Sequence, residues 1–237
     1  MVKSKFSTAD EIQRELVGLE KKFYTTLFTY YKRNIRPLMG VIQPEFIREK
    51  FDKFIRQLVR KYIALSADIS REVIDLRVNE VRLNPVIDSL VIFPSTEDND
   101  NQLKLTLDGV NTFWRTVTRI ANRESEQILV MNPDGTKELE DKKPLSEDSL
   151  ILSAVSHMIF FAFNTIMFAK LSQINGQLQS TGIPLQEVQF RTIGDKRVDP
   201  AVCRPLDGKR WIIGDPNIVV PPRMTHINCR CILLPLI

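Results

Sequence analysis

Apolar residues recur every three to four positions near the start of the chain, which is the spacing of an amphipathic helix. Thr8 and Glu11 form a capping-box signature ahead of this stretch. Arg36-Pro37 is expected to end it, because proline cannot continue the hydrogen-bonded backbone of a helix. The pattern therefore predicts a first helix between Thr8 and Arg36. Its buried stripe should consist of Ile12, Leu16, Leu19, Phe23, Leu27 and Tyr30.

A second and longer helical pattern begins at Pro44, a residue favoured in the first turn of a helix. We expect it to run until Asn84-Pro85 and to pack in a helical bundle. The predicted apolar face comprises Phe46, Phe51, Phe54, Leu58, Tyr62, Leu65, Ile69, Val73 and Leu76. The opposite, basic face comprises Arg48, Lys53, Arg56, Arg60, Arg71 and Arg82.

Residues 95–102 are polar and acidic and are predicted to form a loop. A third helix is predicted over residues 107–131, because apolar residues again follow helical spacing. Asn132-Pro133-Asp134-Gly135 has the composition of a turn, and residues 136–143 are expected to be a charged connector. The residues expected to point inward from this helix are Val110, Phe113, Val117 and Ile120.

Residues 150–171, LILSAVSHMIFFAFNTIMFAKL, form the most apolar stretch of the chain. Its length approaches that of a membrane span. We predict instead a central helix shielded by protein, because five polar residues interrupt it and buried polar groups need hydrogen-bond partners. His157 is expected to be a core histidine whose ring nitrogens are satisfied. The five polar residues are Ser153, Ser156, His157, Asn164 and Thr165.

From residue 185 onward the helical pattern gives way to short apolar runs separated by turn signals. Asp207-Gly208 is a tight-turn signal that leads into Trp211, and Pro221-Pro222 stops a later run. Short strands are predicted at residues 190–192, 211–213, 218–220 and 229–235. The chain is thus predicted to be α+β, with a mainly helical N-terminal part, a bundle of long helices, followed by a small turn-rich β-module. We assign residues 1–145 to a helical scaffold and residues 146–237 to an apolar helix plus the β-module.

Charge is unevenly spread along the 237 residues. Residues 1–83 carry a net charge of +6, residues 84–179 carry −5 and residues 180–237 carry +3. A basic N-terminal part is compatible with a solvated helix face or with binding to nucleic acid or an acidic protein surface. No Walker loop, Rossmann glycine pattern, His-Glu-x-x-His or Gly-x-Ser-x-Gly motif occurs, so we do not expect an enzyme. The N-terminus lacks the apolar run of a signal peptide, and a reducing compartment is expected.

All three cysteines and one of the two histidines lie near the C-terminus. Cys203, His226, Cys229 and Cys231 match the ligand types of a tetrahedral Cys3His zinc site. Cys229 and Cys231 would point to opposite faces of a regular strand, so both can bind one ion only if the backbone turns there. A disulfide and plain buried thiols are the other interpretations, whereas Cys/His catalysis lacks an orienting third group. In each case the turns between Cys203 and Cys229 predict that at least three of these side chains meet.

Three motifs in this region occur together. They are Asp195-x-Arg197-Val198-x-Pro200, Cys203-x-x-Leu206-Asp207-Gly208 and Pro222-x-x-x-His226-x-x-Cys229-Arg230-Cys231. This combination resembles the C-terminal signature of phage Mu F-type minor head proteins, also called phage head morphogenesis proteins, over residues 150–237. Asp199 stands where many members of that family have their first cysteine, and one extra residue separates Pro200 from Cys203.

The resemblance implies a minor capsid protein of a tailed bacteriophage that works by binding. Such a protein would sit at the portal vertex and in the capsid interior of the virion, and in the host cytoplasm during assembly. Its partners would be the portal protein, the major capsid protein and packaged DNA, with several copies per virion and no membrane contact. The competing hypothesis is a zinc-stapled nucleic-acid-binding protein with a basic helical arm.

Overall fold

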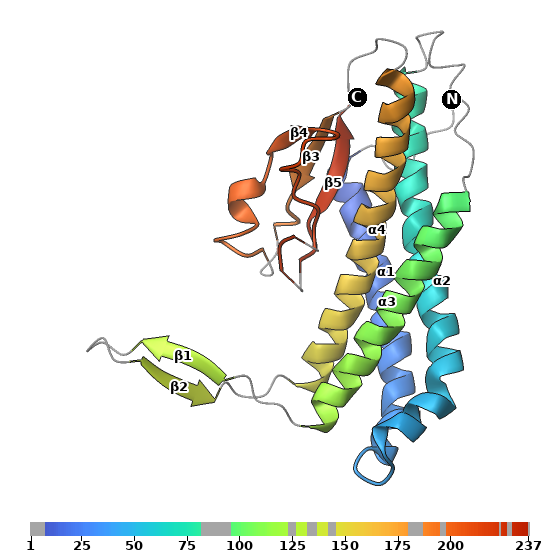
Figure 1. Cartoon of the computed structure of the whole chain (residues 1–237), viewed down its shortest axis with the longest axis vertical. Helices are drawn as coiled ribbons and strands as arrows, with labels where there is room; N and C mark the ends of the chain where they lie inside the picture. Colours follow the sequence, from blue (N-terminus) through green and yellow to red (C-terminus); the bar gives the residue numbers. More distant parts are fainter. Residues whose placement is uncertain are drawn as a thin grey trace.

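The computed structural model describes residues 8–81, 96–122, 127–131, 137–141, 146–179, 187–194, 198–222, 224–226 and 229–236. Four long helices form a bundle, and a small three-stranded antiparallel sheet lies beside it (Figure 1). The predicted α+β class is confirmed. The helices are α1 (Ala9–Tyr30), α2 (Pro44–Val81), α3 (Thr96–Ala121) and α4 (Glu147–Gln179). The sheet has the strand order β4-β3-β5, with β3 Glu187–Arg191, β4 Arg210–Ile212 and β5 Ile232–Leu236.

Helix α1 begins where the sequence predicts, after Thr8, but it ends at Tyr30, before the predicted end at Arg36-Pro37. The backbone N–H of Glu11 donates to Thr8 Oγ1 at 3.3 Å, and the Thr8 N–H donates to Glu11 Oε2 at 3.0 Å. A π-helical turn at Tyr31–Ile35 and a 3-10 turn at Arg36–Leu38 follow the helix. Gly40 then adopts a φ of 82°, a left-handed conformation that favours glycine, and the chain reverses into α2.

Helix α2 starts at Pro44 as predicted, but its buried face is rotated from the predicted one. Phe46, Phe54 and Leu65 are 60%, 38% and 40% exposed, so the assignment of these three residues to the core was wrong. Apolar residues occupy more than half of the circumference of this helix, so spacing alone fits more than one rotation. The predicted break at Asn84-Pro85 lies outside the described residues. The residues that α2 buries include Ile47, Ile55, Leu58, Val59, Tyr62, Ile63, Ala67, Ile69, Val73 and Ile74.

Three predictions around α3 were wrong. Residues 95–102 were expected to be a loop, but α3 begins at Thr96, and acidic residues such as those that follow it favour the first turn of a helix. The helix predicted over residues 107–131 ends at Ala121, and residues 127–131 form β1 (Gln127–Met131). Strand β1 pairs with β2 (Lys137–Asp141) in an antiparallel hairpin that extends away from the bundle in Figure 1. The prediction of a charged connector over residues 136–143 was therefore also wrong, because pairing with β1 makes residues 137–141 a strand. The apolar residues 127–131, which include β-branched residues, precede a segment with turn-forming composition, and this combination favours a hairpin over a helix. That segment, residues 132–135, lies outside the described residues.

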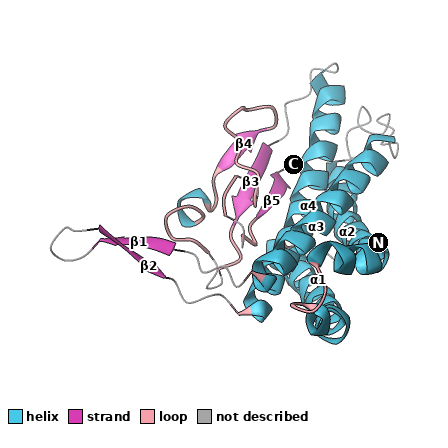
Figure 2. Ribbon diagram, turned by 60° about the horizontal axis from the view of Figure 1, so that its bottom comes forward, coloured by secondary structure: helices cyan, strands magenta, loops and turns pink. Residues whose placement is uncertain are grey.

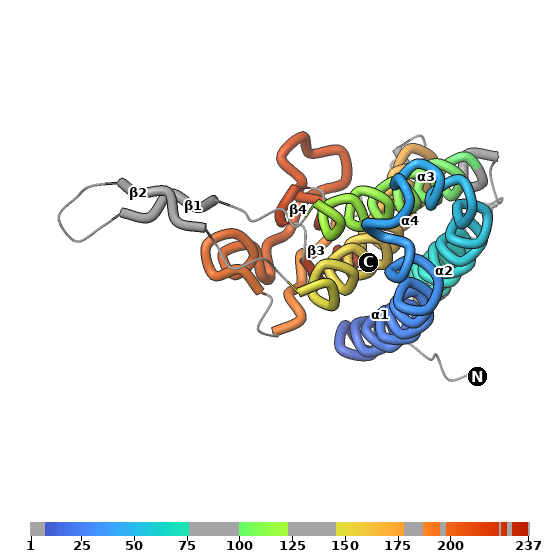
Figure 3. The backbone as a smooth tube through the Cα atoms, turned by 90° about the horizontal axis from the view of Figure 1, so that it is seen from below, coloured from blue at the N-terminus to red at the C-terminus, as the bar shows by residue number. Residues whose placement is uncertain are grey.

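Helix α4 contacts each of the other three helices (Figure 3). It is long and apolar enough to cross a membrane by length and composition, and 67% of its most apolar window is buried inside the protein. Serines of α2 allow a close approach, since Ser66 Oγ donates to the Ile159 carbonyl at 2.8 Å and Ser70 Oγ to the Phe163 carbonyl at 2.9 Å. Although we assigned α4 to the same region as the β-module, it packs with the bundle as well as with β5.

The β-module lies beside α4 (Figure 2). Buried side-chain amides of α4 bond to its backbone. Asn164 Nδ2 donates to the Cys231 carbonyl at 3.0 Å, and its Oδ1 accepts from the Leu233 N–H at 2.8 Å. Asn164 thereby bonds the edge of β5 as a neighbouring strand would. Asn175 Nδ2 donates to the Ile213 carbonyl at 3.1 Å.

Within the module, three of the four predicted strands are present with shifted bounds. Gly208 has a φ of 79° in the predicted turn before β4. Residues 218–220 do not form the predicted strand, because the Ile218 N–H bonds to the Asp215 carbonyl at 3.2 Å and closes a turn. The last strand begins at Ile232 instead of Cys229.

Candidate metal centre

A turn at Asp199 places the first candidate ligand, Cys203. The Asp199 carbonyl accepts from the Cys203 N–H at 2.9 Å. Its carboxylate accepts from the N–H groups of Ala201 and Val202 at 2.8 and 2.9 Å, and these bonds lower the pKa of Asp199. The residue that replaces the first cysteine of the resembled family is therefore engaged in shaping the backbone ahead of Cys203.

Cys203, His226 and Cys229 come together as one group. Their sulfur atoms, Cys203 Sγ and Cys229 Sγ, are 3.7 Å apart, and His226 Nε2 is 3.0 Å from Cys203 Sγ. Two sulfurs that bind one zinc ion at about 2.3 Å with tetrahedral angles lie about 3.8 Å apart. The prediction that at least three of the four side chains meet is confirmed, and the group could hold a metal ion.

Cys231 lies beside this group but its sulfur does not belong to it among the described residues. Residues 229–231 do not belong to a regular strand, because β5 begins only at Ile232. The Cys229 N–H bonds to the His226 carbonyl at 3.0 Å. The Cys231 N–H donates to Cys229 Sγ at 3.4 Å. Cys231 is 1% exposed, and its thiol hydrogen-bonds to those of Cys229 and Cys203.

The three thiols differ in their pKa. Hydrogen bonding from Cys231, with smaller contributions from Thr225 and Cys203, lowers the pKa of Cys229 to about 6 despite its burial. Burial first, and then the neighbouring Cys229 charge, raises the pKa of Cys203 to about 11. The pKa of Cys231 is also raised, because its proton is held against Cys229. The arrangement stabilises one thiolate at Cys229, and a metal ion would displace the other protons.

Arg230 anchors the cysteine segment to the bundle. Its guanidinium donates to both carboxylate oxygens of Glu20 on α1, with Nε 3.1 Å from Oε1 and Nη2 bonded to Oε2. Ser156 on α4 also donates to Glu20 Oε1. The side chains of Glu20 and Arg230 are 1% and 14% exposed, so this is a buried ion pair between the first helix and the residue that separates two candidate ligands. No sequence motif indicates this pair, because its two members are 210 positions apart.

The second histidine differs from the prediction made for it. His157 stacks on Phe161, but its buried Nδ1 has no hydrogen-bond partner among the described residues. Burial lowers the pKa of His157, an effect that the nearby Asp108 carboxylate opposes. The prediction of a satisfied core histidine was therefore wrong, and this orphaned atom requires an explanation.

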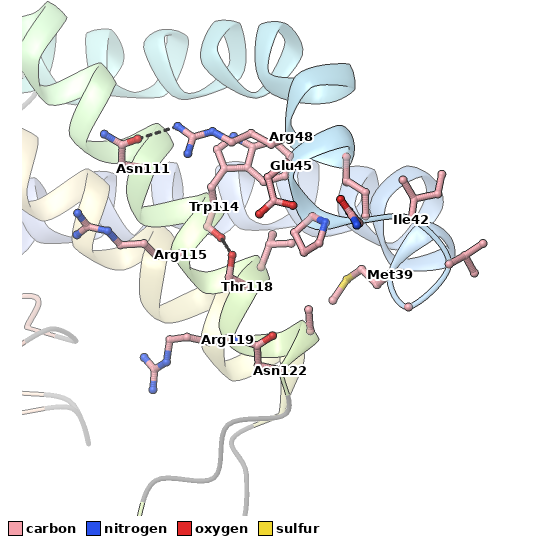
Figure 4. A pocket seen from close by; sticks show the side chains of 17 residues that line it. Met39, Ile42, Glu45, Arg48, Asn111, Trp114, Arg115, Thr118, Arg119 and Asn122 are labelled. Atoms are coloured by element: carbon pink, nitrogen blue, oxygen red, sulfur yellow. Dashed lines mark hydrogen bonds between the residues drawn. The ribbon is translucent and has the colours of Figure 1, made fainter.

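A groove of about 980 Å³ lies at the other end of the bundle, between the α1–α2 connection, the start of α2 and the end of α3 (Figure 4). Val41 lines the groove and is 80% exposed. Phe46, in the first turn of α2, is 60% exposed. Arg48 lines the groove and donates to Asn111 at 3.0 Å. Exposed apolar side chains beside arginine are typical of surfaces that contact another protein.

Part of the predicted basic face of α2 is neutralised by its own helix. Asp52 forms ion pairs with Arg48 at 3.8 Å and Arg56 at 2.7 Å, and Asp68 pairs with Arg71 at 2.7 Å. These carboxylates reduce the positive potential that a nucleic-acid surface would need.

Comparison of the chain with models of known protein families, with curated proteins and with solved structures finds no match.

Proposed function

We propose that this protein is a minor head protein of a tailed bacteriophage that acts by binding at the portal vertex and in the capsid interior. The observation that carries the proposal is the folding of the signature itself. Cys203 and the His226–Cys229 segment, which lie far apart in sequence, meet in one module that docks on α4. The described cysteine and histidine residues of the signature thus lie together in one small module. The Asp195 and Arg197 part of the signature lies outside the described residues.

We further propose that the module holds a structural zinc ion. Cys203, His226 and Cys229 would bind it, with Cys231 as the fourth ligand. A set of three cysteines and one histidine is typical of a closed structural site. A sheet of three short strands buries little apolar surface by itself, so zinc binding would contribute directly to its folding free energy.

The helical bundle would supply the surface for the portal protein. Two exposed apolar residues of the α1–α2 connection, Val41 and Ile42, line the groove of Figure 4. The exposed Phe46 lies in the first turn of α2. Burial of such side chains supplies much of the binding energy in protein interfaces.

Two measurements test this function. Mass spectrometry of purified virions of the phage that encodes the chain should detect the protein, and the portal protein of that phage should bind it saturably in solution. Val41→Asp should weaken this binding by at least about tenfold, or about 1.4 kcal/mol, because Val41 lines the groove, is 80% exposed and would be buried by the portal protein. Leu103→Asp is the matched control, because Leu103 is 61% exposed but lies outside the groove.

Absence of the protein from virions, together with no affinity for the portal protein, would overturn the proposal. DNA binding that weakens steeply as salt is raised would instead support the nucleic-acid hypothesis.

A further inference from the structure

A second cavity, of about 480 Å³, adjoins the candidate metal centre. It lies between α3, α4 and the loop that precedes Cys229. Both histidines of the chain line it: His157 from α4 and His226 from the loop. Asp108 and Lys104 of α3 lie at its exposed side, and Thr225 lines it next to His226.

This cavity is the side from which the metal centre can be reached. Cys203 and Cys229 are 0% exposed and Cys231 is 1% exposed. Of the four candidate ligands only His226 is partly exposed, and His226 belongs to both the metal centre and the cavity. An ion that enters from solvent therefore meets the cavity before it meets a sulfur atom.

The cavity also carries groups that bind divalent metal ions. Imidazole nitrogen and carboxylate oxygen are both zinc ligands. Asp108 forms no hydrogen bond or ion pair through its carboxylate with other described residues. The buried Nδ1 of His157 is inaccessible, which leaves Nε2 as the ring atom for a ligand. Lys104 opposes a cation, but its ammonium group is exposed and screened by salt.

We propose that the cavity is the loading route of the metal centre, with Asp108 and His157 as transient ligands that pass a zinc ion to His226 and the cysteines. This inference rests on the zinc site of the proposed function. The step is ligand exchange without redox change. The hydrated ion first exchanges water molecules for Asp108 and His157. It then exchanges these two ligands for His226 and the cysteines, whose thiol protons go to solvent. A role in delivery gives a function to a histidine that lines this cavity beside His226.

The test is the rate at which the metal-free, reduced protein takes up Co²⁺, followed in a stopped-flow instrument by thiolate-to-cobalt absorption. Asp108→Asn and His157→Phe should each slow the second-order uptake about three- to tenfold, because local charge and ligands raise the concentration of the ion at the site. Phenylalanine retains the stacking on Phe161. Lys104→Gln should speed uptake, and Asp100→Asn, a change on the same helix outside the cavity, should leave it unchanged.

The equilibrium affinity and the final cobalt spectrum should stay unchanged in all these variants, since transient ligands are absent from the final complex. Unchanged uptake rates for both Asp108→Asn and His157→Phe would overturn the loading route and leave the zinc site standing. Loss of affinity at an unchanged uptake rate would also overturn it, because it would show a structural role. Absence of cobalt absorption in the unmodified protein would instead refute the zinc site, and the loading route with it.

Discussion

The buried ion pair between Glu20 and Arg230 gives the sharpest test of how the β-module is held on the bundle. Glu20→Ala removes a carboxylate that accepts hydrogen bonds from Arg230 and Ser156. The Arg230 guanidinium, 14% exposed, would lose this carboxylate. Breaking a buried pair in this way costs about 3–5 kcal/mol. This is a large share of the about 5–15 kcal/mol by which a protein is usually stable.

Urea denaturation with tryptophan fluorescence measures this loss in each part of the protein. Trp114 lies in α3 and donates to Asp52 at 2.9 Å, whereas Trp211 lies in β4. Trp114→Phe and Trp211→Phe backgrounds therefore leave one reporter in the β-module and one in the bundle. In Glu20→Ala the Trp211 transition should move to lower urea than the Trp114 transition, because the bundle keeps its own apolar core.

Two further variants separate the charge effect from general damage. Asp68→Ala breaks the Asp68–Arg71 pair, whose carboxylate side chain is 64% exposed, and should cost less than about 1 kcal/mol. Glu20→Leu combined with Arg230→Met removes both charges and should recover most of the lost stability. If Glu20→Ala costs no more than Asp68→Ala, the pair does not hold the module and the reasoning is wrong.

Three other predictions concern the metal centre, His157 and the packing of α3. Cys203→Ser should bind zinc at least tenfold more weakly, about 1.4 kcal/mol, and lower the Trp211 transition while the Trp114 transition stays in place; titration of the metal-free protein checks this. Because burial lowers the pKa of His157 in the folded state below the unfolded value of 6.5, its contribution to stability is complete above that pH and is lost as pH falls below it. His157→Phe should therefore flatten the fall in unfolding free energy between pH 6.5 and lower pH, and an unchanged slope would contradict the assignment. Gly109→Ala would place a Cβ 2.8 Å from Val59 Cγ1 and should destabilise the bundle, since overpacking costs about 1–3 kcal/mol against a helix-propensity gain of about 1 kcal/mol. Gly18→Ala meets no atom within 4 Å and should stabilise α1, so equal shifts in thermal midpoint for the two variants would refute the close contact.

Features decided by neighbouring residues could be predicted from the sequence. The capping box at Thr8 and the glycine turn at Gly208 need only residues within a few positions of one another. The meeting of Cys203 with His226 and Cys229 was also predictable, because turn residues between them bring the ends of the segment together. The position of Cys231 was not, since it depends on where β5 begins.

Features decided by packing could not be read from spacing. Phe46 and Ile47 are adjacent apolar residues, and only the placement of the other helices decides that Ile47 is 3% exposed and Phe46 60% exposed. The same holds for residues 127–131, whose apolar side chains suit a helix or a strand until the pairing with β2 is known. Local propensity sets the candidates, and tertiary contact selects among them.

The polar residues that interrupt α4 illustrate what the sequence can predict about buried hydrogen bonds and what it cannot. Ser156 and Asn164 predicted that this apolar helix must face protein groups able to bond them, but not which groups. Their partners are Glu20, which is 136 positions from Ser156, and the Cys231 and Leu233 backbone, which is 67 and 69 positions from Asn164. Apolar contact is non-directional and would let the module slide along α4. A displaced module would break the bonds of Asn164 to the Cys231 carbonyl and the Leu233 N–H. Because a buried polar group that loses its partner costs about 1–3 kcal/mol, Asn164 fixes the cysteine segment at one place on α4.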